Sequence, residues 1–376
     1  MRTTATRWLL LAGLLGLTAC SWFGGDKKMS LLTEYPPTAK VATLWQKNIG
    51  KLSPLGFAPL IQEGVLYGAS GNGQVVAIEL AANRELWRIG FKEKLSAGVG
   101  GGANSVYVGT RKGEVVALDL AGKERWRSVV SSEILAAPQA FQGVVVVRTV
   151  DGRIVGLDEV DGKRRWLQQR TNPALVLRNL APIVAAGNLI YVGTPGGRLV
   201  AMNVSDGNVA WEEAVSQPRG VTELERIADV AAAPLLDSEQ VCAVSYQGRL
   251  ACFDQKKGSL EWYRDVSSAS GLAKDSRALY TTDARGAVLA FAKASGTNLW
   301  KQEKLQGRKL SGPAVTGNYV VVGDVEGFIH VLERESGQLA ARVATDKSPI
   351  VTSPLVIENG VIVQTQKGNF YAIMIQ

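Results

Sequence analysis

Short apolar runs separated by glycine-containing turns recur along nearly the whole chain. One repeat reads APIV (181–184), LIYVGT (189–194), RLVAMN (198–203) and NVAWEE (208–213), with turns at Gly187-Asn188, Gly196-Gly197 and Asp206-Gly207. β-rich runs bounded by such turns predict antiparallel hairpins. We therefore expect four strands in each repeat, with an Ala-Pro pair at the start of the first strand, where proline is tolerated.

Two markers repeat with this unit. The tryptophans are Trp45, Trp87, Trp126, Trp166, Trp211, Trp262 and Trp300, with gaps of 42, 39, 40, 45, 51 and 38 residues. The glycines that open the third strand are Gly73, Gly113, Gly152, Gly197, Gly248, Gly286, Gly327 and Gly368. A period of about 40 residues is typical of propellers. The fold is predicted as all-β, an eight-bladed propeller of four-stranded antiparallel blades.

The two ends of the repeat array are complementary. The last repeat (354–376) stops after its third strand, and VATLWQKN (41–48) is a fourth strand without its first three. Pairing them would complete the eighth blade and leave no open edge. The seventh repeat is the weakest copy, because Ala341 or a neighbour stands in the place of its tryptophan. We expect the tryptophans to pack between blades rather than to form a ligand-binding aromatic box.

Composition agrees with a water-soluble body of this kind. Hydrophobic residues make up 46% and charged residues 20% of the chain, and the formal net charge is +8. The basic residues are spread over the chain, and no Lys/Arg run interleaved with aromatic residues occurs. This pattern argues against nucleic acid as a partner.

The amino terminus has the features of an export signal. Arg2 and Arg7 precede an apolar stretch from Trp8 to Leu17 that is too short to span a bilayer. Leu17-Thr18-Ala19-Cys20 resembles the bacterial lipobox, and Ser21 follows instead of the aspartate of an inner-membrane retention signal. We expect a lipoprotein signal peptide (1–19), a flexible tether lipidated at Cys20 (20–40) and the propeller (41–376). The predicted location is the periplasmic face of the outer membrane, through a lipid anchor.

Few residues suggest catalytic or metal chemistry. His330 is the single histidine and has no partner at metal-ligand or triad spacing. Asp119, Asp158 and Asp254 recur at one place in their hairpins, which is typical of carboxylates that order turns. Cys242 and Cys252 lie on adjacent predicted strands, and either a disulfide or two buried thiols agrees with the sequence.

Two consecutive connections between repeats are longer than the others. Trp166 to Ala181 and Trp211 to Ala233 span 15 and 22 residues, against 9 to 11 for the connections after Trp87, Trp126 and Trp262. Both link an outer strand to the next inner strand, so they would emerge on one face of the ring. Long loops on a rigid scaffold often carry function. The first (172–180) offers Leu175, Leu177 and Arg178, which is a typical set of protein-interface anchors, although the leucines could instead cap the core. The second (212–229) is charged, and we expect a helical turn in it.

The AxDxxxGxxxW-like segments resemble the pyrroloquinoline-quinone (PQQ) family of propellers, whose enzymes are quinoprotein dehydrogenases. The chain lacks the vicinal cysteine pair, the calcium-ligand cluster and the long insertions that such enzymes would need. From the lipobox onward it is more similar to the BamB family of outer-membrane lipoproteins, because VLRN (176–179) and TELERIADV (222–230) are similar to that family's loops. This resemblance implies a scaffold without catalysis or cofactor, and a PQQ-dependent periplasmic dehydrogenase is the alternative.

The resemblance also implies partners and the residues that contact them. In the family, this face docks the periplasmic POTRA domains of BamA, the central subunit of the barrel-assembly (BAM) complex. Leu175, Leu177, Arg178 and Asp229 are the residues that match. Ala231 stands where the family's second loop tends to have another aspartate, which weakens the match there. Further implied partners are the other lipoproteins of the complex and unfolded outer-membrane proteins.

Overall fold

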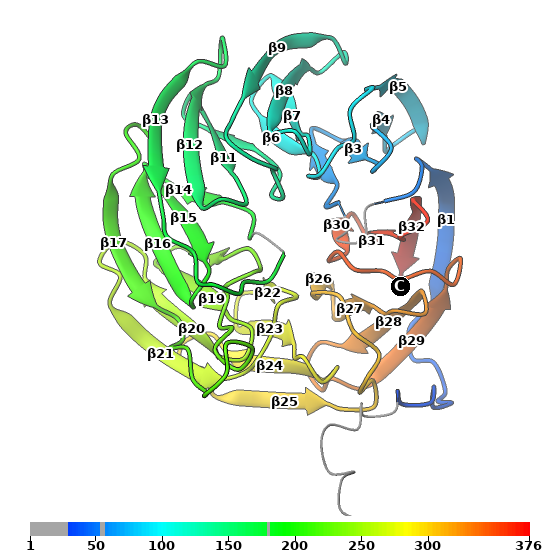
Figure 1. Ribbon diagram of the computed structural model, residues 1–376. Helices are drawn as coiled ribbons and strands as arrows, with labels where there is room; N and C mark the ends of the chain where they lie inside the picture. The colour runs from blue at the N-terminus through cyan, green and yellow to red at the C-terminus, as the bar shows by residue number, and fades with distance from the viewer. Residues whose placement is uncertain (1–28, 53–56, 179–180) are drawn as a thin grey trace, which may run out of the picture.

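The computed structural model describes residues 29–52, 57–178 and 181–376, and these residues form a closed ring of eight four-stranded antiparallel sheets around a central axis (Figure 1). Each sheet is one blade, and in seven of the eight blades the strand that comes last in the sequence lies at the perimeter. The described ranges contain no α-helix, and therefore no helix that could cross a membrane. The predicted eight-bladed propeller is confirmed.

The strands of each blade, from the axis outward, are as follows. Blade one has β2 (Leu60–Gln62), β3 (Val65–Ala69), β4 (Gln74–Glu79) and β5 (Arg84–Gly90), and blade two has β6 (Gly100–Gly102), β7 (Ser105–Gly109), β8 (Glu114–Asp119) and β9 (Glu124–Val129). Blade three has β10 (Gln139–Phe141), β11 (Val144–Arg148), β12 (Arg153–Asp158) and β13 (Arg164–Gln169), and blade four has β14 (Val184–Ala186), β15 (Leu189–Thr194), β16 (Arg198–Asn203) and β17 (Val209–Ala214). Blade five has β18 (Leu235–Leu236), β19 (Gln240–Val244), β20 (Arg249–Asp254) and β21 (Leu260–Asp265), and blade six has β22 (Leu272–Lys274), β23 (Ala278–Thr282), β24 (Val288–Ala292) and β25 (Asn298–Gln302). Blade seven has β26 (Ala314–Thr316), β27 (Tyr319–Gly323), β28 (Phe328–Glu333) and β29 (Leu339–Ala344), and blade eight has β30 (Leu355–Ile357), β31 (Gly360–Gln364), β32 (Asn369–Ile375) and β1 (Val41–Asn48).

Blade eight joins the two ends of the chain. β1 pairs antiparallel with β32, from Val41 opposite Ile375 to Asn48 opposite Asn369. The amino-terminal strand thus supplies the outer strand that the last repeat lacks. The ring closes as expected, over the predicted residues 41–48.

The second and third strands of each blade are buried on both faces, as the residues of β11 and β12 are. One face packs on the preceding blade and the other on the following blade, which explains why these strands read as continuous apolar runs. The innermost strands differ from the prediction. In blade four, β14 begins at Val184, so Ala181-Pro182 lies before the strand, in the loop that leads into it.

Six tryptophans join each of blades one to six to the blade that follows it. Indole Nε1 of Trp87, Trp126, Trp166, Trp211, Trp262 and Trp300 donates a hydrogen bond to a backbone carbonyl of the following blade, over 2.8 to 3.2 Å. Each of these rings also covers a turn glycine of that blade. At Gly296, for example, φ is +65° and a Cβ would lie 2.3 Å from the Trp262 ring, so only glycine fits. The expected packing between blades is confirmed.

Blade seven is built differently because the amino-terminal segment enters the ring beside it. Ala341 occupies the place of the tryptophan, opposite Val331 and next to the strand irregularity. Thr38 N donates to the Ala340 carbonyl over 2.9 Å, and Ala39 is buried in the same apolar cluster as Ala341. A small residue at position 341 therefore leaves room for the incoming chain.

The same segment corrects one expectation. Residues 29–40 were expected to belong to a flexible tether, but they lie along blade seven and the loop before it. Ser30 N donates to the Gln306 carbonyl over 2.9 Å, and Arg342 donates to the Thr33 carbonyl over 3.2 Å. The rest of the expected tether, with Cys20, and the expected signal peptide lie outside the described residues.

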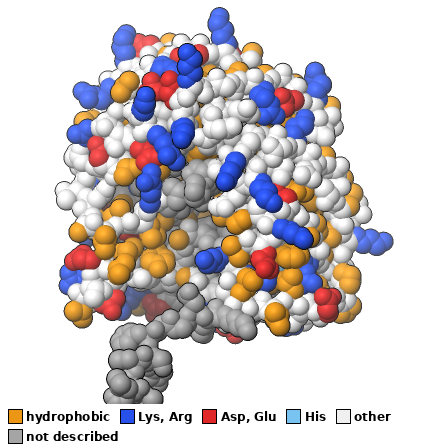
Figure 2. Space-filling model, turned by 45° about the vertical axis from the view of Figure 1, so that its right-hand side comes forward, with side chains coloured by type: hydrophobic (Ala, Val, Ile, Leu, Met, Phe, Trp, Pro, Cys, Tyr) orange, Lys and Arg blue, Asp and Glu red, His pale blue; other side chains and the backbone are white. Residues whose placement is uncertain are grey.

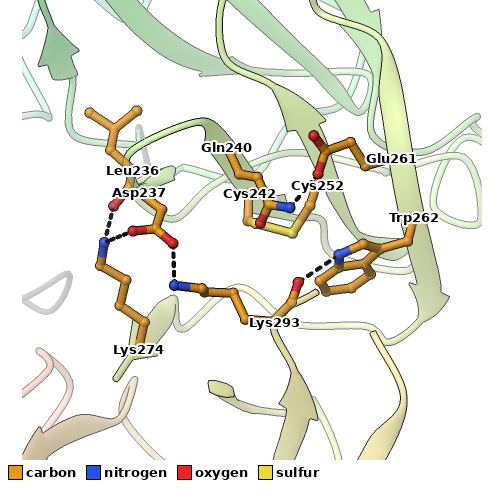
Figure 3. The surroundings of a disulfide bond; sticks show 9 residues. All are labelled: Leu236, Asp237, Gln240, Cys242, Cys252, Glu261, Trp262, Lys274 and Lys293. Atoms are coloured by element: carbon orange, nitrogen blue, oxygen red, sulfur yellow. Dashed lines mark hydrogen bonds and ion pairs between the residues drawn. A yellow bond between two sulfur atoms is a disulfide. The ribbon is translucent and has the colours of Figure 1, made fainter. Parts of the chain in front are cut away.

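The two cysteines of blade five form a disulfide. Cys242 on β19 lies directly opposite Cys252 on β20, with 4.0 Å between the Cα atoms (Figure 3). Both residues are buried, and the Trp262 ring packs in the same cluster. The alternative of two free thiols is thereby excluded.

Candidate functional site

The two long loops lie on one face of the ring. They join β13 to β14 (170–183) and β17 to β18 (215–234). Since the strands alternate in direction, the connections between blades and the turns between second and third strands share this face. We call it the loop face. The turns between third and fourth strands lie on the opposite face.

Asp229 connects the two long loops. Its side chain is only 3% exposed, and its carboxylate accepts hydrogen bonds from Leu177 N, over 2.6 Å, and from Gly196 N, over 3.0 Å. Leu177 belongs to the first loop and Gly196 to the β15–β16 turn. The family resemblance implies that Asp229 contacts a partner, but the structure turns this carboxylate inward, where it holds the first loop in place.

The first loop presents an apolar side chain and a guanidinium to solvent. Leu175 is 44% exposed and Leu177 is half-buried. The Arg178 side chain is 62% exposed, and its Nη2 lies 2.5 Å from Glu133 Oε2, on the loop between β9 and β10. Because this ion pair lies at the surface, a carboxylate of a partner could take the place of Glu133 beside the Arg178 guanidinium.

The second loop contains the expected helical turn. Thr222 and Glu225 form a capping box, because Glu225 Oε2 accepts from Thr222 N over 3.0 Å and Thr222 Oγ1 accepts from Glu225 N over 3.3 Å. The turn holds Val221 and Leu224 outward, 91% and 66% exposed. These two residues were not among the sequence-predicted site residues, although apolar residues three apart on either side of a capping threonine are a recognisable signal. Ala231 is buried in this structure.

We refer to Leu175, Leu177, Arg178, Val221 and Leu224 as the candidate docking surface, or the docking surface for short. It combines exposed apolar side chains with one guanidinium, on two loops that the Asp229 carboxylate joins. Such a combination is typical of the centre of a protein–protein interface.

His330 has a partner that its spacing in the sequence did not reveal. The ring is fully buried, and Nε2 lies 2.9 Å from Asp324 Oδ2, which also accepts from Arg308 Nε over 2.6 Å. Arg308 donates to the Ser30 carbonyl over 3.1 Å and pairs with Glu326. Burial lowers the pKa of His330, against the opposing effect of the Asp324 carboxylate. This network fastens the amino-terminal segment to blade seven.

The recurring aspartates order turns, as expected. The carboxylate of Asp119 accepts from Ala121 N and Lys123 N, and that of Asp254 from Lys256 N and Lys257 N. Asp158 accepts from Val160 N over 2.8 Å. In the described part of the chain, no group of three or more His, Cys, Asp or Glu residues is arranged to hold a metal ion.

Charge is distributed rather than concentrated. Figure 2 shows Lys and Arg side chains at many separate places on the visible face, with acidic side chains among them. Many of the arginines are ion-paired with a neighbouring carboxylate, as Arg165 is with Asp158 over 2.7 Å. On this face, basic and acidic side chains are thus interspersed rather than separated into patches of one sign.

Known proteins resemble the chain along nearly its whole length. A family model described as "Outer membrane protein assembly factor BamB" matches residues 71–302 and 284–376. The BamB of Bordetella pertussis is 42% identical over 369 residues, which cover 97% of this chain and 96% of the relative. The BamB of Nitrosomonas eutropha is 42% identical, over 90% of this chain and 83% of the relative.

Solved structures agree with these relatives. The crystal structure of BamB from Moraxella catarrhalis superposes with a TM-score of 0.82 at 26% identity, covering 89% of this chain and all of that one. The quinohemoprotein alcohol dehydrogenase of Comamonas testosteroni superposes with a TM-score of 0.70 at 14% identity, over 89% of this chain and 76% of that one, and so shares the fold alone. Together, the family model and these relatives establish that the chain belongs to the BamB family.

Proposed function

We propose that this protein is a non-catalytic scaffold of outer-membrane protein assembly, which binds the POTRA domains of a BamA-like central subunit through the docking surface. The relatives are named as assembly factors of outer-membrane proteins, and the chain aligns with them over nearly their full length. The observation that carries the proposal is the pair of long loops on one face, with Leu175, Arg178, Val221 and Leu224 held outward.

The loops are held in place before any partner arrives. Two backbone N–H groups bind the Asp229 carboxylate, and the capping box fixes the turn that carries Val221 and Leu224. A surface whose loops are already ordered loses less conformational entropy on binding, which favours affinity. The buried core of the ring supplies the rigid support.

The proposed location is the periplasmic face of the outer membrane, with lipid on Cys20. In support, Cys20 ends a lipobox-like segment and Ser21 follows it. The described chain begins close to this residue and is hydrogen-bonded at Ser30 to the loop that precedes blade seven. Other lipoproteins of the complex and unfolded outer-membrane proteins remain candidate partners of the same scaffold.

The central experiment removes the Arg178 guanidinium. The soluble protein without residues 1–20 is titrated with a purified POTRA fragment of the BamA-like subunit from the same organism. Arg178→Ala should weaken binding by about 2 kcal/mol, or roughly thirtyfold, because a guanidinium anchor loses its charge-assisted hydrogen bonds to a carboxylate. Lys256→Ala with Lys257→Ala, in a turn on the opposite face, is the control and should leave the affinity unchanged.

Two results would overturn the proposal. One is normal binding by Arg178→Ala together with unfolding of the Leu175→Ala, Leu177→Ala double variant, which would make the loop structural. The other is a stoichiometric change in the absorption spectrum of added PQQ with calcium, accompanied by dye reduction, which would favour the dehydrogenase alternative.

A further inference from the structure

A cleft of about 390 Å³ opens between blades three and four, on the loop face. Its walls are the β11–β12 turn, the β15–β16 turn and the start of the first long loop. Four arginines line it, namely Arg148, Arg153, Arg170 and Arg198, together with one acidic residue, Glu212. Pro173 also lines the cleft and lies two residues before Leu175 of the docking surface.

Arg148 is the unusual residue of this cleft. It is 5% exposed, and its Nη1 donates to the Ala181 carbonyl over 2.6 Å. Within the described ranges no carboxylate pairs with it. Burial lowers the pKa of Arg148 to about 10, with a further contribution from Arg170, so the side chain stays charged at neutral pH. A buried charge without a counter-ion is costly unless a ligand supplies one.

In the other blades, the position equivalent to Arg148 does not carry a basic residue. The residues at the same register in the other seven blades are all uncharged: Ala69, Gly109, Gly193, Val244, Thr282, Gly323 and Gln364. The propeller fold therefore does not require a guanidinium at this place. The charge is specific to blade three.

The remaining arginines are only partly neutralised. Arg170 and Arg198 share one carboxylate, since their nitrogens lie 2.8 and 3.4 Å from the Glu212 oxygens. Arg153 lies 3.5 Å from Asp151, which is not among the lining residues. Four arginines against one glutamate leave the lining with a net charge of +3. The cleft thus carries uncompensated positive charge that favours binding of an anion.

We propose that this arginine cleft receives a carboxylate side chain, from Asp or Glu, of the protein that docks on the adjacent surface. This inference rests on the proposed function. A partner seated on Leu175 and Arg178 lies beside the mouth of the cleft, because Pro173 belongs to both the cleft wall and the docking loop. Docking would displace water from the cleft, which strengthens the attraction between its arginines and an inserted carboxylate.

The test measures the Kd for the POTRA fragment at 50 and 300 mM NaCl. Arg198→Gln should weaken binding on the order of tenfold at low salt and reduce the salt dependence. Its side chain is half exposed at the start of β16, so the variant is expected to fold. Arg148→Met, which keeps the apolar stem, should weaken binding at least as much, provided its circular dichroism matches the parent. The control is Arg165→Gln, an ion-paired arginine on the opposite face, which should bind normally.

The acidic partner residue is found by changing each Asp and Glu of the POTRA docking region to its amide. One of these changes should weaken binding to the parent protein and add little to Arg198→Gln. If the parent binds and both arginine variants bind equally well, the cleft proposal fails while the docking proposal stands. If the parent does not bind at all, the docking proposal fails. Stabilisation by inorganic phosphate that depends on Arg148, with unchanged POTRA binding in the variants, would identify a site for a free anion and also overturn the proposal.

Discussion

The Asp229 carboxylate lies at the junction of the two long loops, where it accepts backbone hydrogen bonds from Leu177 and Gly196. Both donors are main-chain groups, so this residue controls the path of the first loop rather than the chemistry of its side chains. It is almost fully buried and presents little surface to a partner. We therefore expect its effect on binding to pass through the positions of Leu175 and Arg178.

Replacing Asp229 by Asn tests this positioning role. The amide keeps one acceptor oxygen, but its NH2 group replaces the other oxygen and faces a backbone N–H donor. One of the two buried hydrogen bonds is therefore lost, which should cost about 1–3 kcal/mol in local stability. We expect faster amide hydrogen exchange at Leu177 and weaker POTRA binding, with the propeller still folded. Unchanged exchange at Leu177 together with weakened binding would mean that Asp229 contacts the partner directly.

His330 makes the stability of blade seven dependent on pH. Burial lowers its folded-state pKa, whereas an unfolded histidine takes up a proton near pH 6.5. Below that pH the unfolded state binds more protons, so stability falls as the pH drops from about 6.5 to the folded-state pKa, by at most about 1.4 kcal/mol per pH unit.

Urea unfolding at pH 7.5 and 5.5 measures this loss. His330→Gln should be less stable at both values, because it disrupts the bond to Asp324, but it should lose less stability between them. The pKa of Asp324 is lowered despite its burial, by the hydrogen bond and charge of His330, so its own contribution is lost only at lower pH. Equal losses in the parent and the variant would rule out His330 as the source.

At the scale of elements, β1 is the strand on which ring closure depends. It contributes the outer edge of blade eight through the pairs from Val41 to Asn48. Deleting residues 41–48 exposes the edge of β32 and separates blades seven and eight from the amino-terminal segment. Since each backbone hydrogen bond contributes about 1 kcal/mol net, the deletion should cost more than about 3 kcal/mol.

Thermal unfolding measured by circular dichroism checks this expectation. The matched control is deletion of residues 21–28, which removes the same number of residues and none of the described strands. Its melting temperature should stay close to that of the parent. A melting temperature that is equally unaffected by the 41–48 deletion would show that the eighth blade closes in another way.

The blades were predictable because their signals are local. The turns, the tryptophan period and the span of β1 each follow from a few neighbouring residues, and the structure has them where the sequence predicts them. The innermost strands begin later than expected because Pro182 has no N–H to donate and the strand needs only three residues, Val184–Ala186.

The inward orientation of Asp229 was not predictable in the same way. Its bond to Leu177 joins residues 52 positions apart, across a loop without regular structure. The Asp324–His330 contact, by contrast, spans the turn at Gly327 and could have been found, because both residues flank one hairpin turn. Local pairs of that kind can be read from a hairpin, whereas contacts between loops cannot.

At the scale of the molecule, the amino-terminal segment and the docking surface lie on different parts of the ring. Residues 29–40 run beside β29 of blade seven, whereas the docking surface lies between blades three and five (Figure 1). A membrane anchor that enters beside blade seven would leave the docking surface free. Ser30 follows Cys20 by ten positions in the chain, and a fully extended chain of that length reaches at most about 36 Å. A lipid on Cys20 would therefore hold the propeller close to the membrane.

Changing Cys20 to Ala tests this arrangement in cells. Without the thiol there is no acceptor for the acyl chain, so the variant should accumulate as an unprocessed precursor and lose labelling by radioactive palmitate. The propeller itself should stay folded, because every strand of the ring begins at residue 41 or later. Ser21→Asp is the matched variant, and it should still be labelled but fractionate with the inner membrane, since aspartate at this place resembles the retention signal. Normal labelling of the Cys20→Ala protein would disprove the anchor and, with it, the limit on the distance between the propeller and the membrane.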